Sequence, residues 1–221
     1  MNPDRTAARM LAKQYIERDD PLGWFEPLYA RAKEGVAVVP WADMTPNPYL
    51  VAWLNTSHAP QNEMRALKIG CGLGDDAEEL SRHGFSVVGF DISPTAIQWC
   101  KKRFPQSTVQ YVVADLFHPP SPWLHSFDFV LESYTLQVLP PLLRREAIRD
   151  IRNFIAPGGT LLVICRGRSH NEDSGLMPWP LTREELNEFI IAGLRLINFS
   201  DFKDNEESPV RRFRAEYRAV D

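Results

Sequence analysis

The sequence predicts a doubly wound α/β fold, in which a mostly parallel sheet carries helices on both faces and an antiparallel strand near one edge. Two segments support this prediction most directly. The segment Ala66–Asp76 (ALKIGCGLGDD) predicts an apolar strand, a tight glycine turn and a helix that opens with acids. The segment Val87–Ser93 (VVGFDIS) predicts a second apolar strand that ends at a carboxylate. Such a unit is typical of the nucleoside-binding half of a doubly wound sheet.

The other elements follow from hydrophobic periodicity, with short apolar runs as strands and longer periodic stretches as helices. The predicted strands are Arg65–Ile69, Ser86–Phe90, Val109–Ala114, Phe127–Leu131, Thr160–Cys165, Leu194–Phe202 and Val210–Val220. The predicted helices are Thr6–Arg18, Pro21–Glu34, Asp76–His83, Pro94 to about Arg103, Pro141–Ile155, and one from Thr182 to about Ala192. The linker 204–209 (DNEESP) is too short for a crossover helix, so we expect an antiparallel turn there.

Capping and turn residues indicate where several of these elements begin and end. Ser93 followed by Pro94 is typical of an N-cap with proline at the first helical position. Thr182 precedes Glu185 by the spacing of a capping box. The run 156–159 (APGG) predicts a turn that ends one helix and starts the next strand.

A length of 221 residues fits a single domain. Within it we expect residues 1–60 to form a helical, aromatic lid and residues 61–221 to form the nucleoside-binding core. Three of the six tryptophans, Trp24, Trp41 and Trp53, precede the first predicted strand. A segment this aromatic is expected to dock on the main body. We interpret Trp24 and Trp41 as lid residues and Trp53 as core packing.

Composition and charge argue against several classes of function. A net charge of −4, with no long run of one sign, argues against a nucleic-acid partner. The first residues have no apolar core of signal-peptide length, and no apolar run approaches membrane-spanning length, so we expect a cytoplasmic protein without a membrane partner. Scattered cysteines predict free thiols, namely Cys71, Cys100 and Cys165. The histidines form no spaced metal pair, so we expect no metal site: His58, His83, His118, His125 and His170.

The charge of the glycine turn bears on which nucleoside is bound. A dinucleotide brings a pyrophosphate, and its fingerprint has a third glycine where this chain has Asp75, followed by Asp76. Two carboxylates at that point repel a pyrophosphate. They are compatible with S-adenosylmethionine, which carries a sulfonium, an ammonium and only one carboxylate. The alternative is that both acids only stabilise the helix N-terminus, and a pyrophosphate is disfavoured in that case too.

Two acids at strand ends are candidate nucleoside contacts. Asp91 ends the second predicted strand, where a carboxylate can accept both ribose hydroxyls; the alternative is a solvated acid that begins the Ser93 cap. Asp115 ends the third predicted strand, where a carboxylate can accept the adenine amino group, with Leu116 and Phe117 against the ring. The alternative for Asp115 is a turn aspartate.

From residue 65 to residue 164, the ordered motifs LKIGCGLG, VVGFDIS, YVVADLF, FDFVLES and IAPGGTLLVI resemble those of class I S-adenosylmethionine-dependent methyltransferases. Each motif alone is weak, whereas the ordered set is specific. The run GCGLGDDAEEL, the Pro-Trp-containing N-terminal segment and the closing VRRFRAEYR are similar, more narrowly, to bacterial small-molecule methyltransferases related to thiopurine S-methyltransferases. The resemblance implies a Rossmann-like sheet of seven strands whose last strand is antiparallel, with S-adenosylmethionine as the cofactor.

The resemblance also implies roles for individual residues. The glycine turn wraps the methionyl part of the cofactor, the acid after the second strand binds the ribose, and the residues after the third strand bind the adenine. The cofactor-binding candidates are Gly70, Cys71, Gly72, Gly74, Asp75, Asp91, Ile92, Asp115, Leu116 and, from the lid, Trp41. The catalytic candidates, near the sulfonium at the end of the fourth strand, are Glu132 and Tyr134, with Ser133 beside them.

One residue departs from the family pattern. The family usually has an acid two residues before the first glycine of the turn, and this chain has Lys68, which cannot hold the cofactor ammonium. Three alternatives are open. Asp75 or Asp76 holds the ammonium, Lys68 meets the cofactor carboxylate, or Lys68 extends its stem along the strand and its head into water.

The expected reaction is methyl transfer to a small molecule, with a thiol or another soft nucleophile as the leading acceptor. Sulfur nucleophiles need little help from a base. An amine or hydroxyl would need one, and Glu132 is the best-placed candidate unless it is a structural acid. Arginines that follow or lie in the last strands either meet an anionic substrate group or are exposed: Arg166, Arg168, Arg211, Arg212 and Arg214.

Three other functions remain open at this point. The first is a methyltransferase that acts on a protein or nucleic acid, and the second is a catalytically silent fold that binds the cofactor or a partner. The third is an NAD-dependent oxidoreductase on the same type of sheet.

Overall fold

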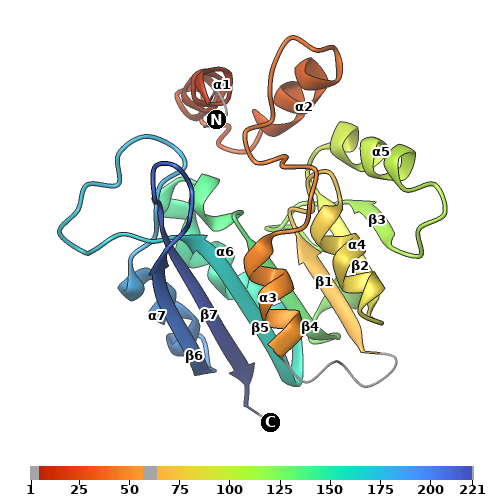
Figure 1. Ribbon diagram of the computed structural model, residues 1–221, viewed down its shortest axis with the longest axis vertical. Coiled ribbons are helices and arrows are strands. Elements are labelled where there is room, and N and C mark those ends of the chain that lie inside the picture. The colour runs from red at the N-terminus through yellow and green to blue at the C-terminus, as the bar shows by residue number, and fades with distance from the viewer. Residues whose placement is uncertain (1–4, 57–63, 221) are drawn as a thin grey trace.

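A seven-stranded sheet with the order β3-β2-β1-β4-β5-β7-β6 forms the centre of the molecule (Figure 1). The computed structural model describes residues 5–56 and 64–220. Strands β1 to β5 pair in parallel, and β7 pairs antiparallel with both β5 and β6. The strands are β1 Arg65–Ile69, β2 Ser86–Asp91, β3 Gln110–Val113, β4 Phe127–Ser133, β5 Ile155–Arg166, β6 Leu194–Lys203 and β7 Arg211–Ala219. The predicted doubly wound architecture is confirmed, including its antiparallel strand.

Helices cover both faces of the sheet. They are α1 Thr6–Ile16, α2 Phe25–Lys33, α3 Pro48–Thr56, α4 Asp75–Arg82, α5 Pro94–Arg103, α6 Pro141–Phe154 and α7 Arg183–Ile191, with short 3-10 turns η1 Ser121–Trp123 and η2 Leu136–Val138. Apolar residues of α3, α4 and α5 pack on one face around Phe129 and Leu131. Apolar residues of α6 and α7 pack on the other face around Val130 and Phe213. Within the described residues, no helix is long and apolar enough to cross a membrane.

The predicted helix caps are present. The Ser93 hydroxyl accepts a hydrogen bond from the Ala96 amide at 3.0 Å, with Pro94 as the first residue of α5. Thr182 and Glu185 form a complete capping box at the start of α7. Each cap satisfies amide groups that have no partner inside the helix, which fixes where the helix begins.

The sequence prediction differs from the structure at two places. Helix α3 was not predicted because the prolines around it indicated a loop, whereas Pro48 is its first residue, a position that proline tolerates. The predicted turn at 156–159 lies inside β5. Ile155 already pairs with Phe127, and the register then changes so that Thr160 pairs with Phe129. The extra residues therefore bulge from a continuous strand and do not form a separate turn.

The N-terminal residues occupy two different places. Helices α1 and α2 lie beyond the carboxyl ends of the parallel strands (Figure 1). Helix α3 instead packs on the sheet, where Trp53 stacks on Phe129 with ring centroids 5.1 Å apart and donates to the Glu216 carboxylate. The packing role predicted for Trp53 agrees with this contact. The expected boundary between residues 60 and 61, and His58, lie outside the described residues.

Two glycines flank α4 in the same backbone region but in different surroundings. Gly74, just before the helix, has φ +94°, and a Cβ there would lie 2.6 Å from the Tyr111 hydroxyl and 3.2 Å from the Cys100 sulfur. Gly84, just after the helix, has φ +89°, and a Cβ there would meet nothing within 4 Å. Of these two glycines, only Gly74 therefore combines a left-handed backbone with a close approach to other side chains.

We expect Gly74→Ala to lower the free energy of unfolding by about 2–5 kcal/mol, because left-handed backbone costs about 1–2 kcal/mol and overpacking about 1–3 kcal/mol. Gly84→Ala should lower the free energy of unfolding only by the cost of the left-handed backbone, about 1–2 kcal/mol. Urea denaturation of both variants measures the difference. Equal losses would show that Tyr111 and Cys100 accommodate the added methyl group.

Candidate active site

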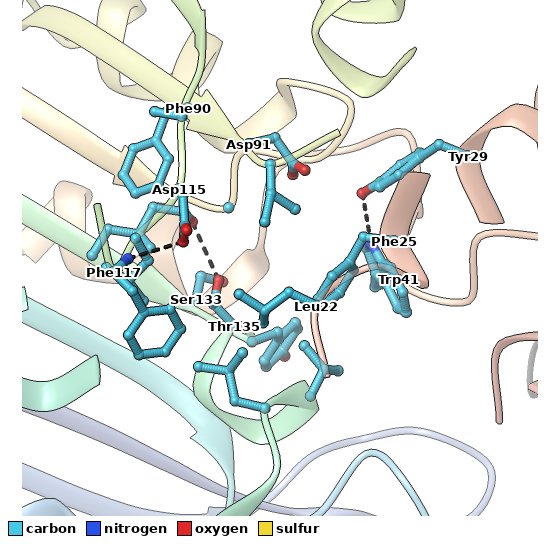
Figure 2. Close-up of a pocket in the computed structure, with 18 residues that line it drawn as sticks. Leu22, Phe25, Tyr29, Trp41, Phe90, Asp91, Asp115, Phe117, Ser133 and Thr135 are labelled. Atoms are coloured by element: carbon cyan, nitrogen blue, oxygen red, sulfur yellow. Dashed lines mark hydrogen bonds between the residues drawn. The ribbon is translucent and has the colours of Figure 1, made fainter. Parts of the chain in front are cut away.

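A cavity of about 650 Å³ opens at the carboxyl ends of β1 to β4, where the strand order reverses between β1 and β4 (Figure 2). This is the place where doubly wound sheets bind ligands. We call it the first cavity. Its lining residues are Leu22, Phe25, Tyr29, Trp41, Ile69, Gly70, Phe90, Asp91, Ile92, Ala114, Asp115, Leu116, Phe117, Ser133, Tyr134, Thr135, Val138 and Leu139.

Asp91 provides a buried carboxylate at the end of β2. One carboxylate oxygen accepts the Gly72 amide and the other accepts the Ser93 amide, both at 3.0 Å. Each oxygen retains capacity for a further donor, so two hydroxyl groups can bind. Burial raises the pKa of Asp91 to about 6, although both amide hydrogen bonds act in the opposite direction. The predicted ribose-binding residue thus lines the cavity in a form that can accept two hydroxyls.

Asp115, after β3, also lines the first cavity (Figure 2). One carboxylate oxygen accepts the Phe117 amide at 3.0 Å, and the other lies 2.8 Å from Nδ1 of the exposed His118. Leu116 and Phe117 line the cavity beside it. An acid next to apolar side chains matches the requirements of an adenine ring and its amino group.

Aromatic rings from the N-terminal residues form the side of the cavity that faces Asp91 (Figure 2). Trp41 donates its indole N–H to the Tyr29 hydroxyl at 2.9 Å and meets Phe25 edge-on at 6.4 Å. Trp24 does not line the cavity but stacks on Phe25 with centroids 4.0 Å apart. Of the two tryptophans assigned to the lid, Trp41 therefore faces the cavity and Trp24 supports the ring beside it.

A carboxylate joins this aromatic segment to the core. Glu26 of α2 accepts hydrogen bonds from the Ser93 hydroxyl at 2.5 Å, the Thr95 hydroxyl at 2.6 Å and the Thr95 amide at 3.1 Å. Glu26 thereby caps α5 together with Ser93 and places a negative charge at the helix N-terminus. Its pKa is lowered because these hydrogen bonds outweigh the effect of burial.

The cavity is negatively charged. Its described lining residues include two carboxylates, Asp91 and Asp115, and no lysine or arginine. A diphosphate would have no cation to bind there and would face both acids. A cationic ligand is favoured by the acids and by the π-faces of the aromatic rings.

Only part of the glycine turn reaches the first cavity. Gly70 lines it, whereas Cys71, Gly72 and Gly74 support it from behind. The Cys71 amide donates to the Phe90 carbonyl, and the Gly72 amide donates to Asp91. The three cysteines, which were predicted to be free thiols, are free, and all three are buried. The turn thus contributes mainly by orienting Asp91.

Asp75 does not lie at the cavity. Its carboxylate forms a bidentate pair with Arg103, with N–O distances of 2.7 and 2.8 Å. Its predicted contact with the cofactor is therefore not supported by the geometry. Its neighbour Asp76 accepts the Asn47 amide at 2.7 Å, and the Asn47 side chain in turn donates to Ser133, a lining residue.

Lys68 is only 3% exposed, so its head does not reach water. The ammonium donates to the carbonyls of Ile69 at 2.7 Å and Gly70 at 3.2 Å, and lies 3.5 Å from the Ser133 carbonyl. Its charge also lowers the pKa values of Asp76 and Asp91, although burial raises both overall. Lys68 acts as a buried counter-ion beneath the turn.

Glu132 lies beneath the cavity and does not line it. It is 0% exposed, and one carboxylate oxygen accepts the amides of Thr135 and Leu136 at 2.7 and 2.9 Å. Burial raises its pKa to about 7 against these hydrogen bonds. This geometry fits the alternative that Glu132 is a structural acid. Its carboxylate holds the loop after β4 and does not line the cavity.

Tyr134 lines both the first cavity and a second, larger cavity of about 1710 Å³. It has φ +65°, which is unusual for a bulky residue and common at functional sites. Trp41 and Val138 are the other residues shared by the two cavities. The remaining lining of the second cavity comes from Arg5 and Ala8 at the N-terminus, residues 40–49, Gln137, Arg166, residues 177–178 and residues 204–212.

Sequence reasoning missed several apolar lining residues. Leu22 and Phe25 precede or begin α2, and Thr135, Val138 and Leu139 follow β4. Neither segment carries a motif, so the only available signal was its aromatic or apolar content. Among the described residues, no group of three or more His, Cys, Asp and Glu is arranged to hold a metal.

Comparisons with known proteins agree with this geometry. The family described as "Methyltransferase domain" matches residues 67–163. The chain is 25% identical over 199 residues to probable thiol methyltransferase 2 of Arabidopsis thaliana, covering 88% of this chain and 83% of the relative. It is 25% identical over 183 residues to thiopurine S-methyltransferase of Vibrio vulnificus, covering 75% and 82%.

Solved structures share the fold. The N-methyltransferase NodS of Bradyrhizobium japonicum WM9, in complex with S-adenosyl-L-homocysteine, has a TM-score of 0.69 at 20% identity, covering 89% of this chain and 100% of that chain. A protein described for the conversion of a disulfide bond into a thioacetal group during echinomycin biosynthesis has a TM-score of 0.71 at 19% identity, covering 88% and 91%. At these identities the likeness concerns the fold.

We expect Glu26→Ala to lower the free energy of unfolding by about 1–3 kcal/mol, because charge-assisted hydrogen bonds to Ser93 and Thr95 are lost. Acrylamide should quench tryptophan fluorescence more strongly in this variant, since the ring of Trp41 is less firmly held. Glu34→Ala, at the other end of α2, is the matched control. Unchanged stability and quenching in Glu26→Ala would show that the aromatic segment is held by packing alone.

Proposed function

We propose that this chain, a class I S-adenosylmethionine-dependent methyltransferase, methylates the sulfur of a small-molecule thiol. The observation that carries the proposal is the charge of the first cavity, which has two carboxylates, an aromatic side and no lysine or arginine among its described lining residues. When bound, S-adenosylmethionine supplies an activated methyl group on a cationic sulfur. The chain's own residues need only bind, orient and exclude water.

We assign the residues as follows. Asp91 accepts the ribose hydroxyls, and Asp115 with Leu116 and Phe117 contacts the adenine. Ile92 and Gly70 line the space between them. The negative and aromatic lining also argues against the oxidoreductase alternative, because a nicotinamide dinucleotide needs a cation or a free helix N-terminus for its pyrophosphate.

The aromatic rings on α2 and the following loop have a distinct role. Phe25, Tyr29 and Trp41 face the cavity from one side (Figure 2). An aromatic face near a cation contributes about 0.5–2 kcal/mol, and the same rings exclude water. We therefore propose that residues 22–41 are the lid, a shorter segment than the 1–60 expected from the sequence.

Where the two cavities meet, no described side chain is suited to act as a base, and this favours sulfur as the nucleophile. Among the described residues, Tyr134 is the only titratable side chain shared by the two cavities, and burial raises its pKa to about 12. A tyrosine with that pKa is a poor base near neutral pH. Thiols ionise partly near neutral pH and react as thiolates without such help. We propose that the Tyr134 ring positions the acceptor.

The relatives support this choice. Two of them are named for thiol and thiopurine substrates, and a third, thiocyanate methyltransferase 1 of Arabidopsis thaliana, is named for another sulfur compound. These names favour a small acceptor over a protein or nucleic acid, and an active enzyme over a silent fold. Free, buried cysteines also fit the cytoplasmic location that we propose.

Cofactor affinity should depend on pH through Asp91. Ribose hydroxyls donate to the ionised carboxylate, whose pKa of about 6 is raised from an ordinary 3.8. The Kd for S-adenosylhomocysteine should therefore rise about tenfold from pH 7 to pH 5, as one linked proton requires. The folding stability of the ligand-free protein should increase from pH 7 to pH 5. The pKa of Asp91 is raised in the folded state, so the stability linked to this group is lost as pH rises through 6.

Calorimetry across this pH range measures the effect. Asp91→Asn should bind S-adenosylhomocysteine more weakly at pH 7 and lose the pH dependence, with thermal unfolding as the check on folding. An Asp91→Asn variant with unchanged affinity would remove Asp91 from the ribose site.

The proposed function is tested with a panel of aryl thiols of graded acidity. Because no protein base is proposed, kcat/KM should rise with pH up to the pKa of each acceptor thiol, and the midpoint should move with the acceptor. Tyr134→Phe should retain activity within about threefold, because the ring remains. A midpoint near 7 shared by all acceptors would instead implicate Glu132, and no turnover with any thiol would overturn the proposal.

A further inference from the structure

We propose that the second cavity holds the methyl acceptor and that Arg166 binds an anionic group of it, so that the preferred acceptors are small thiols that carry a carboxylate. This inference rests on the proposed function and specifies its substrate class. It depends on three observations. They are the position of Arg166, the lack of a partner for its side chain among the described residues, and the pairing of the neighbouring charges with other groups.

Arg166 lies in the cavity that we assign to the acceptor. It is the last residue of β5, and its amide donates to the Gln137 side chain at 2.8 Å, which fixes the end of the strand. Both residues line the second cavity. That cavity meets the first at Trp41 and Tyr134, so a molecule in contact with Arg166 can extend toward the donor methyl group.

Among the residues that the structure describes, the Arg166 side chain has no partner. Its guanidinium forms no hydrogen bond or ion pair with any residue in the ranges 5–56 and 64–220, whereas Arg168, two residues later, donates to the carbonyls of Pro180 and Glu172. Burial, together with the nearby charges of Arg5 and Arg212, lowers the pKa of Arg166 to about 10. It therefore remains a cation at neutral pH in a place where an unpaired charge is costly.

The acids that line the second cavity do not pair with Arg166. The buried Asp204 and the more exposed Glu206 both pair with Arg212 at 2.7 Å. Asp43 and Glu207 are exposed, so solvent screens their charges. Arg166 is thus left with capacity for an incoming anion, and a planar guanidinium matches a carboxylate through two parallel hydrogen bonds.

The reaction on such an acceptor balances without another reactant. The thiol loses its proton to solvent, and the resulting thiolate supplies the electron pair of the new carbon–sulfur bond. The electron pair of the bond that breaks remains on the donor sulfur, which becomes a neutral thioether. Arg166 takes no part in these steps. It orients the acceptor through the carboxylate at the far end, which makes it a positioning and specificity residue.

The test compares two acceptors that differ in the anionic group. For 3-mercaptobenzoate, kcat/KM should fall about 10- to 100-fold in Arg166→Gln, the range expected for a charge-assisted hydrogen-bonded pair. For 3-methylthiophenol it should change less than threefold. Arg166→Lys should recover part of the loss, and the matched control Arg168→Gln should not discriminate between the acceptors. Equal losses for both acceptors in Arg166→Gln would overturn the inference.

A binding measurement separates this inference from the proposed function. Calorimetry with benzoate in the presence of S-adenosylhomocysteine should show binding to the unmodified protein and loss of binding in Arg166→Gln, whether or not either thiol is methylated. If neither thiol is methylated while benzoate binding depends on Arg166, the proposed reaction fails and the anion site stands. If benzoate binds equally to both proteins or to neither, the anion site fails.

Discussion

The buried carboxylate of Asp91 is the interaction on which the site depends. It accepts one amide from the glycine turn after β1 and another from the start of α5, so it joins two crossover units of the sheet at their common edge. Glu26 then attaches α2 to the same end of α5. The turn, the helix and the aromatic segment are therefore positioned around one acid, which is buried and still lines the first cavity.

Much of the fold was predictable because local signals agreed with the tertiary arrangement. Ser93 with Pro94 and Thr182 with Glu185 define helix starts that depend on neighbouring residues alone. The bulge before Thr160 was not predictable, because it depends on Ile155 pairing with a strand nearly thirty residues away. Pairing between distant segments leaves no local trace in a single sequence, so a glycine-rich bulge and a glycine-rich turn have the same appearance.

The candidate site residues also differ in how far local sequence could predict them. Asp91 and Asp115 were identified because each follows an apolar strand, and parallel strands bring their carboxyl ends to one edge. Asp75, a candidate for cofactor binding, pairs instead with Arg103 at the far end of α5, and this pairing could not be predicted because it requires the folded chain. Glu132 was uncertain for a related reason. Whether an acid near the end of a strand faces a cavity or the following loop depends on where that loop folds, and here the loop places its amides against Glu132.

Trp41 belongs to the walls of both cavities. One indole thus forms a wall common to two cavities, so a change in its position at one cavity alters the shape of the other. A ligand that moves this ring in either cavity therefore changes the space left for a second ligand in its neighbour.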